Sequence, residues 1–422
     1  MKVKLPQNMW QGFEPIEIDI PDNWETTIHG IEADNMPELT KEQIREKINK
    51  PYGLKPLREL AVGRKKVCIV FDDISRATPT KVLAEVVLEE LHAAGIQKDQ
   101  ISFICALGCH GAHSREEFVN KLGKEIVTNY AIYNHNCYDN LTNIGKSKDG
   151  YDVMINNEVM DSDLKIGIGA ILPHVFNTFG GGGKIIIPGV AGIDSIQQTH
   201  IAAIDFAKKH NITSSATMGD LRVTAMREKI EEVCGMIGEF FKVDCLYNTR
   251  AEIVDVYAGD VVEEYYAAIP MASKIYSTKR AENKDVIISN ANARSNEATI
   301  AYQLASLACG EKGGDIVIID FTERGQVTHY MFGTFGEKSP GRMYKSEPTR
   351  ERFVRKIILY MPNYMETDKF SFGEPEKQIV CRTWDEVLAA LSDRGAGTTC
   401  SVLVDGTMEF FEVDESLIHF EE

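Results

Sequence analysis

Residues 65–95, KKVCIVFDDISRATPTKVLAEVVLEELHAAG, join a short apolar run, a polar loop and an amphipathic segment. The run at 65–73 is rich in β-branched residues and predicts a buried strand. From residue 80 to 95, apolar side chains recur at helical spacing. The helix signals are Thr78 as N-cap, Pro79 at the first position and Gly95 at the end. The stretch therefore predicts a strand–loop–helix unit of an α/β fold.

The same alternation continues along the chain. Further strands are predicted at 101–108, 163–172, 184–189, 285–291, 314–321 and 400–406. Helices are predicted at 114–123, where a Ser-x-x-Glu capping box begins the helix, and at 218–238, 261–273, 297–309, 349–360 and 383–395. This order predicts mostly parallel sheets with helices on both faces.

We expect two α/β domains with the active site in a crevice between them. The first covers residues 1–275 and the second residues 285–405, with the polar interval 273–285 as a hinge. For the tail, 406–422, the sequence leaves open a return to the first domain. No internal repeat is visible in the chain.

Composition excludes several classes of protein. The 422 residues carry a formal net charge of −17, which argues against binding to nucleic acid or to anionic membranes. No run approaches 18 consecutive apolar residues, and no signal peptide is visible, so no membrane span is expected. The nine cysteines lack a C-x-x-C pair, which favours reduced thiols and a cytoplasmic location.

Three unusual loops follow predicted strands: DDISRATP (72–79), ALGCHGAH (106–113) and LPHVFNTFGGGGK (172–184). Ligands of parallel sheets bind beyond the carboxyl ends of the strands. We therefore expect these loops to converge on one crevice.

The first two loops carry acid–base and anion-binding candidates. Arg76 suits a bidentate grip on a carboxylate, and Asp73 suits orienting it or accepting a hydrogen bond from a sugar hydroxyl. Either His110 or His113 suits an acid or base role. A zinc site made of Cys105, Cys109 and the two histidines is disfavoured, because Cys105 lies inside the predicted strand and Cys109 and His110 are adjacent.

The third loop places four glycines before Lys184. It is not a Walker phosphate loop, because residue 178 is Thr and residue 185 is Ile where that pattern needs Gly and Ser or Thr. Lys184 suits a phosphate contact, a Schiff base or another covalent anchor. His174 and His200 flank it.

Taken together, DDISRATP, ALGCH, PHVFNTFGGGGKIIIPG, His200 and AYQ (301–303) resemble the nickel-dependent lactate racemase family. The resemblance implies a nickel-pincer nucleotide cofactor, held through a thioamide by Lys184, with His200 as the nickel ligand. It implies that His110 and His174 are the paired acid–base histidines. It implies further cofactor contacts from Asp73, Ile74, Ser75, Arg76, Gly182 and Gly183, and substrate contacts from Arg76, Tyr302, Gln303 and Ser306.

The implied activity is that of an isomerase that racemises or epimerises a 2-hydroxy acid by reversible hydride transfer. Two positions depart from the lactate-type pattern, with Gly111 in place of arginine and Ser306 in place of lysine. We therefore expect a substrate larger than lactate, such as a sugar acid. The implied partners are the small-molecule substrate and the enzymes that make the cofactor.

Two alternatives remain open at this point. The first is a pyridoxal-phosphate enzyme that uses Lys184 as its Schiff base, although it leaves the three histidines without a role. The second is a non-catalytic protein that binds a sugar acid or the cofactor. The sequence leaves the identity of the 2-hydroxy acid and the oligomeric state undetermined.

Overall fold

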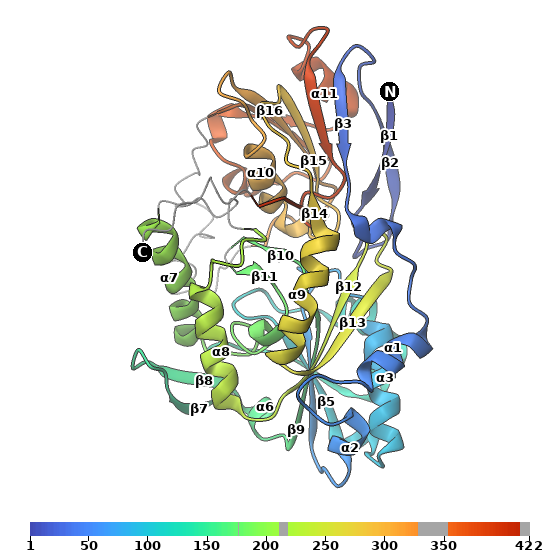
Figure 1. Ribbon diagram of the computed structural model, residues 1–422, viewed down its shortest axis with the longest axis vertical. Helices are drawn as coiled ribbons and strands as arrows, with labels where there is room; N and C mark the ends of the chain where they lie inside the picture. The colour runs from blue at the N-terminus through green and yellow to red at the C-terminus, as the bar shows by residue number, and fades with distance from the viewer. Residues whose placement is uncertain (176, 211–217, 328–352, 414–422) are drawn as a thin grey trace.

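The computed structural model describes residues 1–175, 177–210, 218–327 and 353–413. These residues form two six-stranded, mainly parallel sheets with helices packed against them (Figure 1). The predicted α/β class with two mostly parallel sheets is therefore confirmed.

The first sheet has the strand order β13-β12-β9-β4-β5-β6. All its neighbouring strands are parallel except the outermost pair, β12 and β13. The strands are β4 (Val67–Asp72), β5 (Ile101–Ala106), β6 (Ala131–Asn134), β9 (Leu164–Ala170), β12 (Phe241–Tyr247) and β13 (Ile253–Asp260). The helices of this part are α1 (Lys41–Ile48), α2 (Leu57–Ala61), α3 (Thr80–Ala93), α4 (Arg115–Leu122), α5 (Lys124–Asn129), α6 (Asn157–Met160), α7 (Ile193–Lys209), α8 (Ala225–Ile237) and α9 (Glu263–Tyr276).

Strand β4 shows why this sheet forms at the centre of the domain. Val67, Ile69 and Phe71 pack into one apolar cluster, while Cys68 and Val70 pack into a second cluster on the opposite face. Alternate side chains point to opposite faces of a strand, so an uninterrupted apolar run is buried only when both faces are covered. The hairpin of β7 (Leu141–Lys146) and β8 (Asp152–Asn156) and the short pair β10 (Pro173–His174) and β11 (Thr178–Phe179) lie outside this sheet.

The second sheet has the order β18-β17-β16-β15-β19-β3 and is wholly parallel. Its strands are β3 (Glu25–His29), β15 (Val286–Asn290), β16 (Gly314–Ile319), β17 (Val354–Tyr360), β18 (Gln378–Cys381) and β19 (Thr399–Leu403). Helices α10 (Thr299–Ser306) and α11 (Trp384–Ala390) pack against it. The hairpin of β1 (Lys2–Gln7) and β2 (Phe13–Asp19) joins the same apolar cluster as β15.

The N-terminal boundary of the predicted domains needs correction. Strand β3 pairs with β19, so the first thirty residues belong with the second sheet and not with a unit spanning 1–275 (Figure 1). The predicted hinge also begins inside a helix, because α9 continues to Tyr276. Of the tail, residues 414–422 lie outside the described part. The described portion includes β20 (Phe410–Phe411), which pairs with β14 (Ser277–Thr278).

Two predicted elements are wrong, and one helix start is shifted. Residues 184–189 are not a strand: a 3₁₀ helix covers Gly182–Ile185 and turns follow it, because Pro188 has no N–H for a sheet ladder. The described part of the predicted helix 349–360 is strand β17; residues 349–352 lie outside the described part. Helix α3 begins at Thr80, and Thr78 instead donates its hydroxyl to Asp72 Oδ2 at 2.5 Å.

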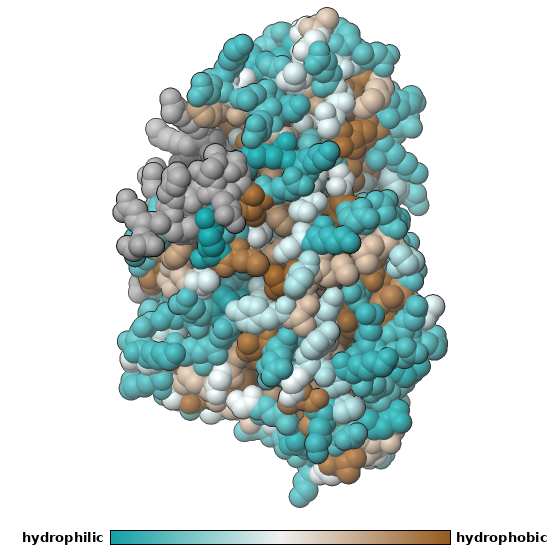
Figure 2. Space-filling view, viewed as in Figure 1, coloured by the Kyte–Doolittle hydropathy of each residue, from teal (hydrophilic) through white to brown (hydrophobic). Residues whose placement is uncertain are grey.

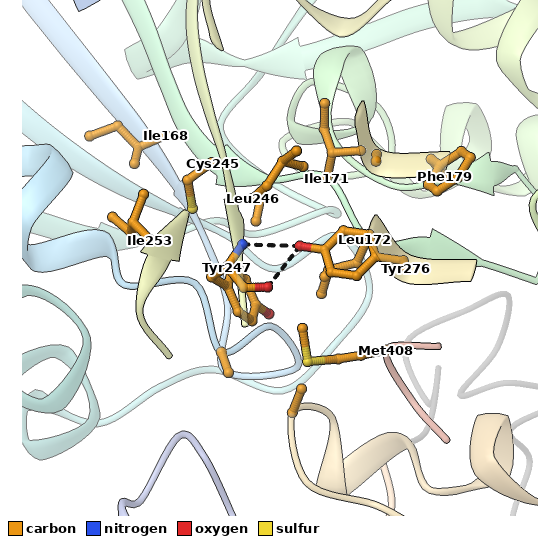
Figure 3. Close-up of a cluster of buried hydrophobic side chains, with 14 of the residues drawn as sticks. Ile168, Ile171, Leu172, Phe179, Cys245, Leu246, Tyr247, Ile253, Tyr276 and Met408 are labelled. Atoms are coloured by element: carbon orange, nitrogen blue, oxygen red, sulfur yellow. Dashed lines mark hydrogen bonds between the residues drawn. The ribbon is translucent and has the colours of Figure 1, made fainter. Parts of the chain in front are cut away.

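The two sheets share an apolar core. Figure 3 shows Leu172 and Phe179 of the glycine-run segment, Tyr247 of β12 and Met408 from near the C-terminus in one cluster. The Tyr276 hydroxyl accepts a hydrogen bond from the Tyr247 N–H at 3.0 Å and donates to the Tyr247 carbonyl at 2.9 Å. This contact fixes the end of α9 against β12.

Hydrophilic side chains predominate on the face of the molecule seen in Figure 2. Within the described ranges, no helix has the length and apolar character needed to cross a lipid bilayer.

Candidate active site between the two sheets

A cavity of about 370 Å³ lies between the two sheets, at the carboxyl ends of β4, β5 and β9. All three loops singled out in the sequence reach it. The polar residues lining it from the first sheet's domain include Asp73, Ser75, Arg76, His110, His174, Lys184 and His200. Those from the second are Glu297, Thr299, Gln303, Gln326, Thr367 and Ser371.

Asp73 organises the loop after β4. Its Oδ1 accepts hydrogen bonds from the Ser75 N–H at 3.1 Å and from the Ser75 hydroxyl at 2.5 Å. Its Oδ2 lies 2.6 Å from His110 Nδ1. Burial disfavours the charged form of His110, but the Asp73 carboxylate outweighs burial and raises the pKa of the imidazole. A proton held on Nδ1 by this carboxylate leaves Nε2 as the basic nitrogen when His110 is neutral.

The structure separates the two candidate histidines of the second loop. His113 Nε2 accepts a hydrogen bond from the Ile74 N–H at 3.1 Å, and its ring does not line the cavity. Ile74 does not line it either, so its expected contact with a cofactor is not supported by its position. His113 therefore supports the Asp73 loop, whereas His110 faces the cavity.

Within the described ranges, no three metal-ligating side chains come together. Cys105 and Cys109 are buried.

Lys184 and His174 face each other across the third loop. Lys184 Nζ lies 2.7 Å from His174 Nε2. Burial, followed by the charges of Arg76 and Arg227, holds the pKa of Lys184 well below its usual value. Burial and the nearby Lys184 hold the pKa of His174 well below its usual value as well. Both shifts favour the neutral forms, an amine that can act as a nucleophile and an imidazole that can act as a base.

His200 projects into the cavity from α7. Its Nδ1–H donates to the Ile196 carbonyl at 2.9 Å, one helical turn back. Burial lowers its pKa to about 4, which keeps the ring neutral. A histidine whose Nδ1–H is held by a carbonyl presents Nε2 as a metal ligand.

The four glycines divide into two pairs. Gly180 and Gly181 line the cavity. By contrast, a Cβ at Gly182 would lie 3.0 Å from the Tyr265 side chain of α9, and a Cβ at Gly183 would collide with Cys234 Sγ of α8. Gly182 and Gly183 therefore allow close packing of two helices, and the expectation that they contact a cofactor is not supported by their position. The Gly182 N–H donates to Asp244 Oδ2 at 2.6 Å, which fixes the turn that carries Lys184.

Arg76 bridges the two domains. Its Nη1 donates to the Ser75 carbonyl at 2.8 Å, to the Ser75 hydroxyl at 3.0 Å and to Glu297 Oε2 at 2.5 Å. Glu297 lines the cavity but was not among the site residues expected from the sequence. The rule that strand-end loops form sites, applied to the loop after β15, would have pointed to this residue.

Helix α10 carries three residues that were expected to contact the substrate, and only one of them lines the cavity. Gln303 lines the cavity. Tyr302 is buried in the core with its hydroxyl against Gly373, and Ser306 Oγ donates to the Gln303 carbonyl at 2.7 Å. Neither Tyr302 nor Ser306 lines the cavity. Their expected substrate contacts are therefore not supported.

The chain is similar in sequence to lactate racemases. Residues 11–211 match the family model described as the lactate racemase N-terminal domain. A lactate racemase from Thermoanaerobacterium thermosaccharolyticum is 23% identical over 318 residues, which cover 73% of this chain and 72% of that protein. A lactate racemase from Lactiplantibacillus plantarum is 26% identical over 289 residues, which cover 66% of this chain and 65% of that protein.

Solved structures show the same fold. The lactate racemase apoprotein from Thermoanaerobacterium thermosaccharolyticum has a TM-score of 0.71 at 22% identity, covering 98% of this chain and 100% of that chain. A crystal structure of a protein from Thermotoga maritima has a TM-score of 0.65 at 16% identity, covering 89% of this chain and 100% of that chain. Residues 11–211 thus form a lactate racemase N-terminal domain, and the chain as a whole has the fold of a lactate racemase.

Proposed function

We propose that this protein is a racemase or epimerase of a 2-hydroxy acid that acts by reversible hydride transfer to a nickel-pincer nucleotide. The observation that carries the proposal is the common cavity of His110, His174, Lys184 and His200. It brings two candidate bases, a partly buried amine and an imidazole suited to binding a metal into one place. The match to the lactate racemase N-terminal domain and the similarity to lactate racemases support the same reaction class.

The residues present fit this cofactor. Lys184 lies partly buried in the cavity, and desolvation lowers the pKa of its amine, which favours the neutral form that a covalent link needs. His200 has its Nδ1 held by the Ile196 carbonyl, so Nε2 would be the nitrogen that ligates a metal. When bound, the nickel-pincer nucleotide supplies a hydride acceptor for the Cα hydrogen and a donor for its return.

The protein itself binds the substrate and moves its hydroxyl proton. Arg76 grips the carboxylate, so that only the substituents on Cα rearrange. His110 or His174 would accept the hydroxyl proton of the substrate and would return a proton to that oxygen as the product forms. Each histidine serves the enantiomer whose hydroxyl lies on its side.

We also propose that the substrate is larger than lactate, on the basis of the polar side chains that line the cavity. Ser306 lies outside the cavity, so the loss of a lysine at that position no longer argues for an enlarged pocket. The support comes instead from the side chains of the second domain that line the cavity, including Thr299, Gln303 and Ser371. These groups suit a substrate with further polar atoms beyond Cα.

The test is a comparison of wild type and Lys184→Ala, each produced together with the enzymes that make the cofactor. We expect wild type to carry a covalent adduct by intact mass and to interconvert the enantiomers or epimers of at least one 2-hydroxy acid. The variant should lose both. An aldimine absorption band abolished by borohydride would instead establish a pyridoxal-phosphate enzyme, and adduct-bearing protein without turnover would establish a binding protein.

A further inference from the structure

We propose that Asp244 is a positioning residue: together with Lys242 and Glu264 it holds the turn that carries Lys184 and thereby sets the reactivity of the Lys184 amine. Lys242 and Asp244 lie on β12 and line the cavity, and Glu264 lies on α9. The inference rests on the proposed function, which needs a reactive amine at Lys184, and it adds residues on which that amine depends.

Two glycines of β9 make room for charged side chains inside the first sheet. Strand β12 runs parallel to β9, with Lys242 opposite Gly167 and Asp244 opposite Gly169. A Cβ at Gly167 would lie 2.8 Å from Lys242 Cδ, and one at Gly169 would lie 3.0 Å from both Lys242 Nζ and Asp244 Oδ1. Residues two apart on a strand share a face, so the two glycines leave one continuous space for an ion pair.

Asp244 uses its two oxygens for different partners. Oδ1 accepts a hydrogen bond from Lys242 Nζ, and the two side chains are 0% and 1% exposed. Oδ2 accepts from the Gly182 N–H at 2.6 Å. Hydrogen bonds to a charged acceptor are stronger than neutral ones. The sheet therefore holds the first residue of the 3₁₀ helix Gly182–Ile185, which contains Lys184.

The backbone of the turn fits closely against this carboxylate. Gly181 and Gly182 have φ angles of 82° and 54°, in the left-handed region that favours glycine. A Cβ at Gly181 would lie 2.9 Å from Asp244 Oδ2 and 2.5 Å from Ile171 Cγ1. The glycines thus let a backbone N–H reach a carboxylate that lies within the sheet.

Glu264 completes the buried cluster. Its side chain is fully buried, and neither of its carboxyl oxygens has a hydrogen-bond partner among the described residues. Burial, followed by the nearby Asp244 carboxylate, raises the pKa of Glu264 well above its usual value. In its protonated form Glu264 is a donor, and Asp244 is the acceptor beside it. One ammonium, one carboxylate and one neutral acid give the cluster no net charge, which suits its burial.

The position of the turn decides the surroundings of the Lys184 amine. Nζ lies 2.7 Å from His174 Nε2, and burial is the first cause that lowers its pKa. If the Gly182 N–H lost its acceptor, the turn could move, water would reach the amine, and its pKa would rise toward the ordinary value. The charged groups that also act on this amine are Arg76, Arg227, Arg294 and Glu297.

The experiment compares two double variants that both remove the buried ion pair. Removing one partner alone would leave an unpaired buried charge, so both partners are replaced together. Lys242→Met with Asp244→Asn keeps an oxygen that can accept from the Gly182 N–H, whereas Lys242→Met with Asp244→Leu removes it. Glu264→Gln, whose amide can still donate to Asp244, and Glu264→Leu, which cannot, form a second matched pair.

The reactivity of Lys184 is measured on protein without cofactor. Trace acetylation by acetic anhydride is followed across a range of pH by peptide mass spectrometry, with the exposed Lys55 as internal reference. Denaturant unfolding of each variant reports its stability separately.

We expect the variant with Asp244→Asn to keep the wild-type midpoint of acetylation. The variant with Asp244→Leu should have a midpoint at least about one pH unit higher, which is roughly tenfold less neutral amine at a pH below the midpoint. Glu264→Gln should match wild type, and Glu264→Leu should shift in the direction of the Asp244→Leu variant.

Two results would overturn the inference. Equal midpoints in the two double variants, with only stability lost, would give the cluster a purely structural role. Equally raised midpoints would assign the effect to the charges of the pair and not to the bond with Gly182. Should the variant with Asp244→Leu fail to fold, equal midpoints in Glu264→Gln and Glu264→Leu would overturn it instead. Failure of the proposed function looks different: wild-type Lys184 then has the lowered midpoint, yet protein produced with the cofactor-making enzymes carries no adduct.

Discussion

Replacing Asp73 by Asn tests whether the Asp73–His110 pair sets the basicity of the catalytic imidazole. The two groups meet at 2.6 Å, and their side chains are only 7% and 16% exposed. The substitution keeps the shape of the side chain and removes its charge. The amide nitrogen can also donate to Nδ1, which would move the imidazole proton to Nε2 and block the basic position.

The magnitude follows from the type of contact. Hydrogen bonds to charged groups contribute about 1.5–3 kcal/mol, which corresponds to a rate loss of roughly 10- to 100-fold if the bond acts in the transition state. The pH dependence has a definite sign. In the proposed mechanism neutral His110 is the base, so activity should rise as pH rises through its pKa. Asp73 raises that pKa, so Asp73→Asn moves the acidic limb of the profile to lower pH.

The assay is the pH profile of kcat/KM on cofactor-loaded protein, measured in the direction that uses His110 as base. Asp205→Asn, which removes an exposed carboxylate, is the control. Equal adduct and nickel content in both variants separates catalysis from cofactor loading. Unchanged kcat/KM with an unmoved acidic limb would refute the role of Asp73.

Three further perturbations have distinct expected results. His200→Ala should retain the covalent adduct and lose nickel, measured by intact mass and metal analysis; full nickel content would exclude His200 as a ligand. Gly183→Ala should lower the free energy of unfolding by about 1–3 kcal/mol, because its Cβ would collide with Cys234; denaturant unfolding checks this. His113→Ala should lower stability by about 1 kcal/mol through the loss of its bond to Ile74, while keeping more activity than His110→Ala; a dead His113 variant beside an active His110 variant would reverse the assignment.

Much of the fold could be predicted because many strands and helices follow from the pattern of apolar residues along a short stretch of sequence. The apolar run of β4 and the helical spacing of α3 are properties of adjacent residues. The sequence of strand β17 also predicts a helix, because Val354, Ile357 and Ile358 fit helical spacing. Its pairing with β16 on one side and β18 on the other decides for the strand. Strand β3 could not be assigned, because its partner β19 lies about 370 residues further along the chain, and no local pattern reports such a pairing.

In the candidate site too, some residues could be predicted from adjacent sequence and others depend on distant parts of the chain. His110, His174 and Lys184 follow strands of one parallel sheet, so topology alone brings them together, and the sequence placed them in one crevice. Glu297 reaches Arg76 only because the second sheet is fixed against the first. The buried Arg294 contributes to that placement by donating to the Pro173 carbonyl at 2.8 Å, beside His174, and to the Thr407 carbonyl at 2.9 Å.

The two sheets contribute different kinds of side chain to the cavity. The groups proposed to hold the cofactor and move protons come from the loops of one sheet, and their relative positions depend on that sheet. The side chains facing them come from the other sheet, so their positions depend on contacts between the sheets such as those of Arg294 and Glu297. A substitution at the junction that leaves the first sheet intact should therefore alter substrate preference before it alters cofactor loading. The candidate cofactor and acid–base residues could thus be predicted from the loops that follow the strands, whereas Glu297 beside Arg76 required the packing of the two sheets.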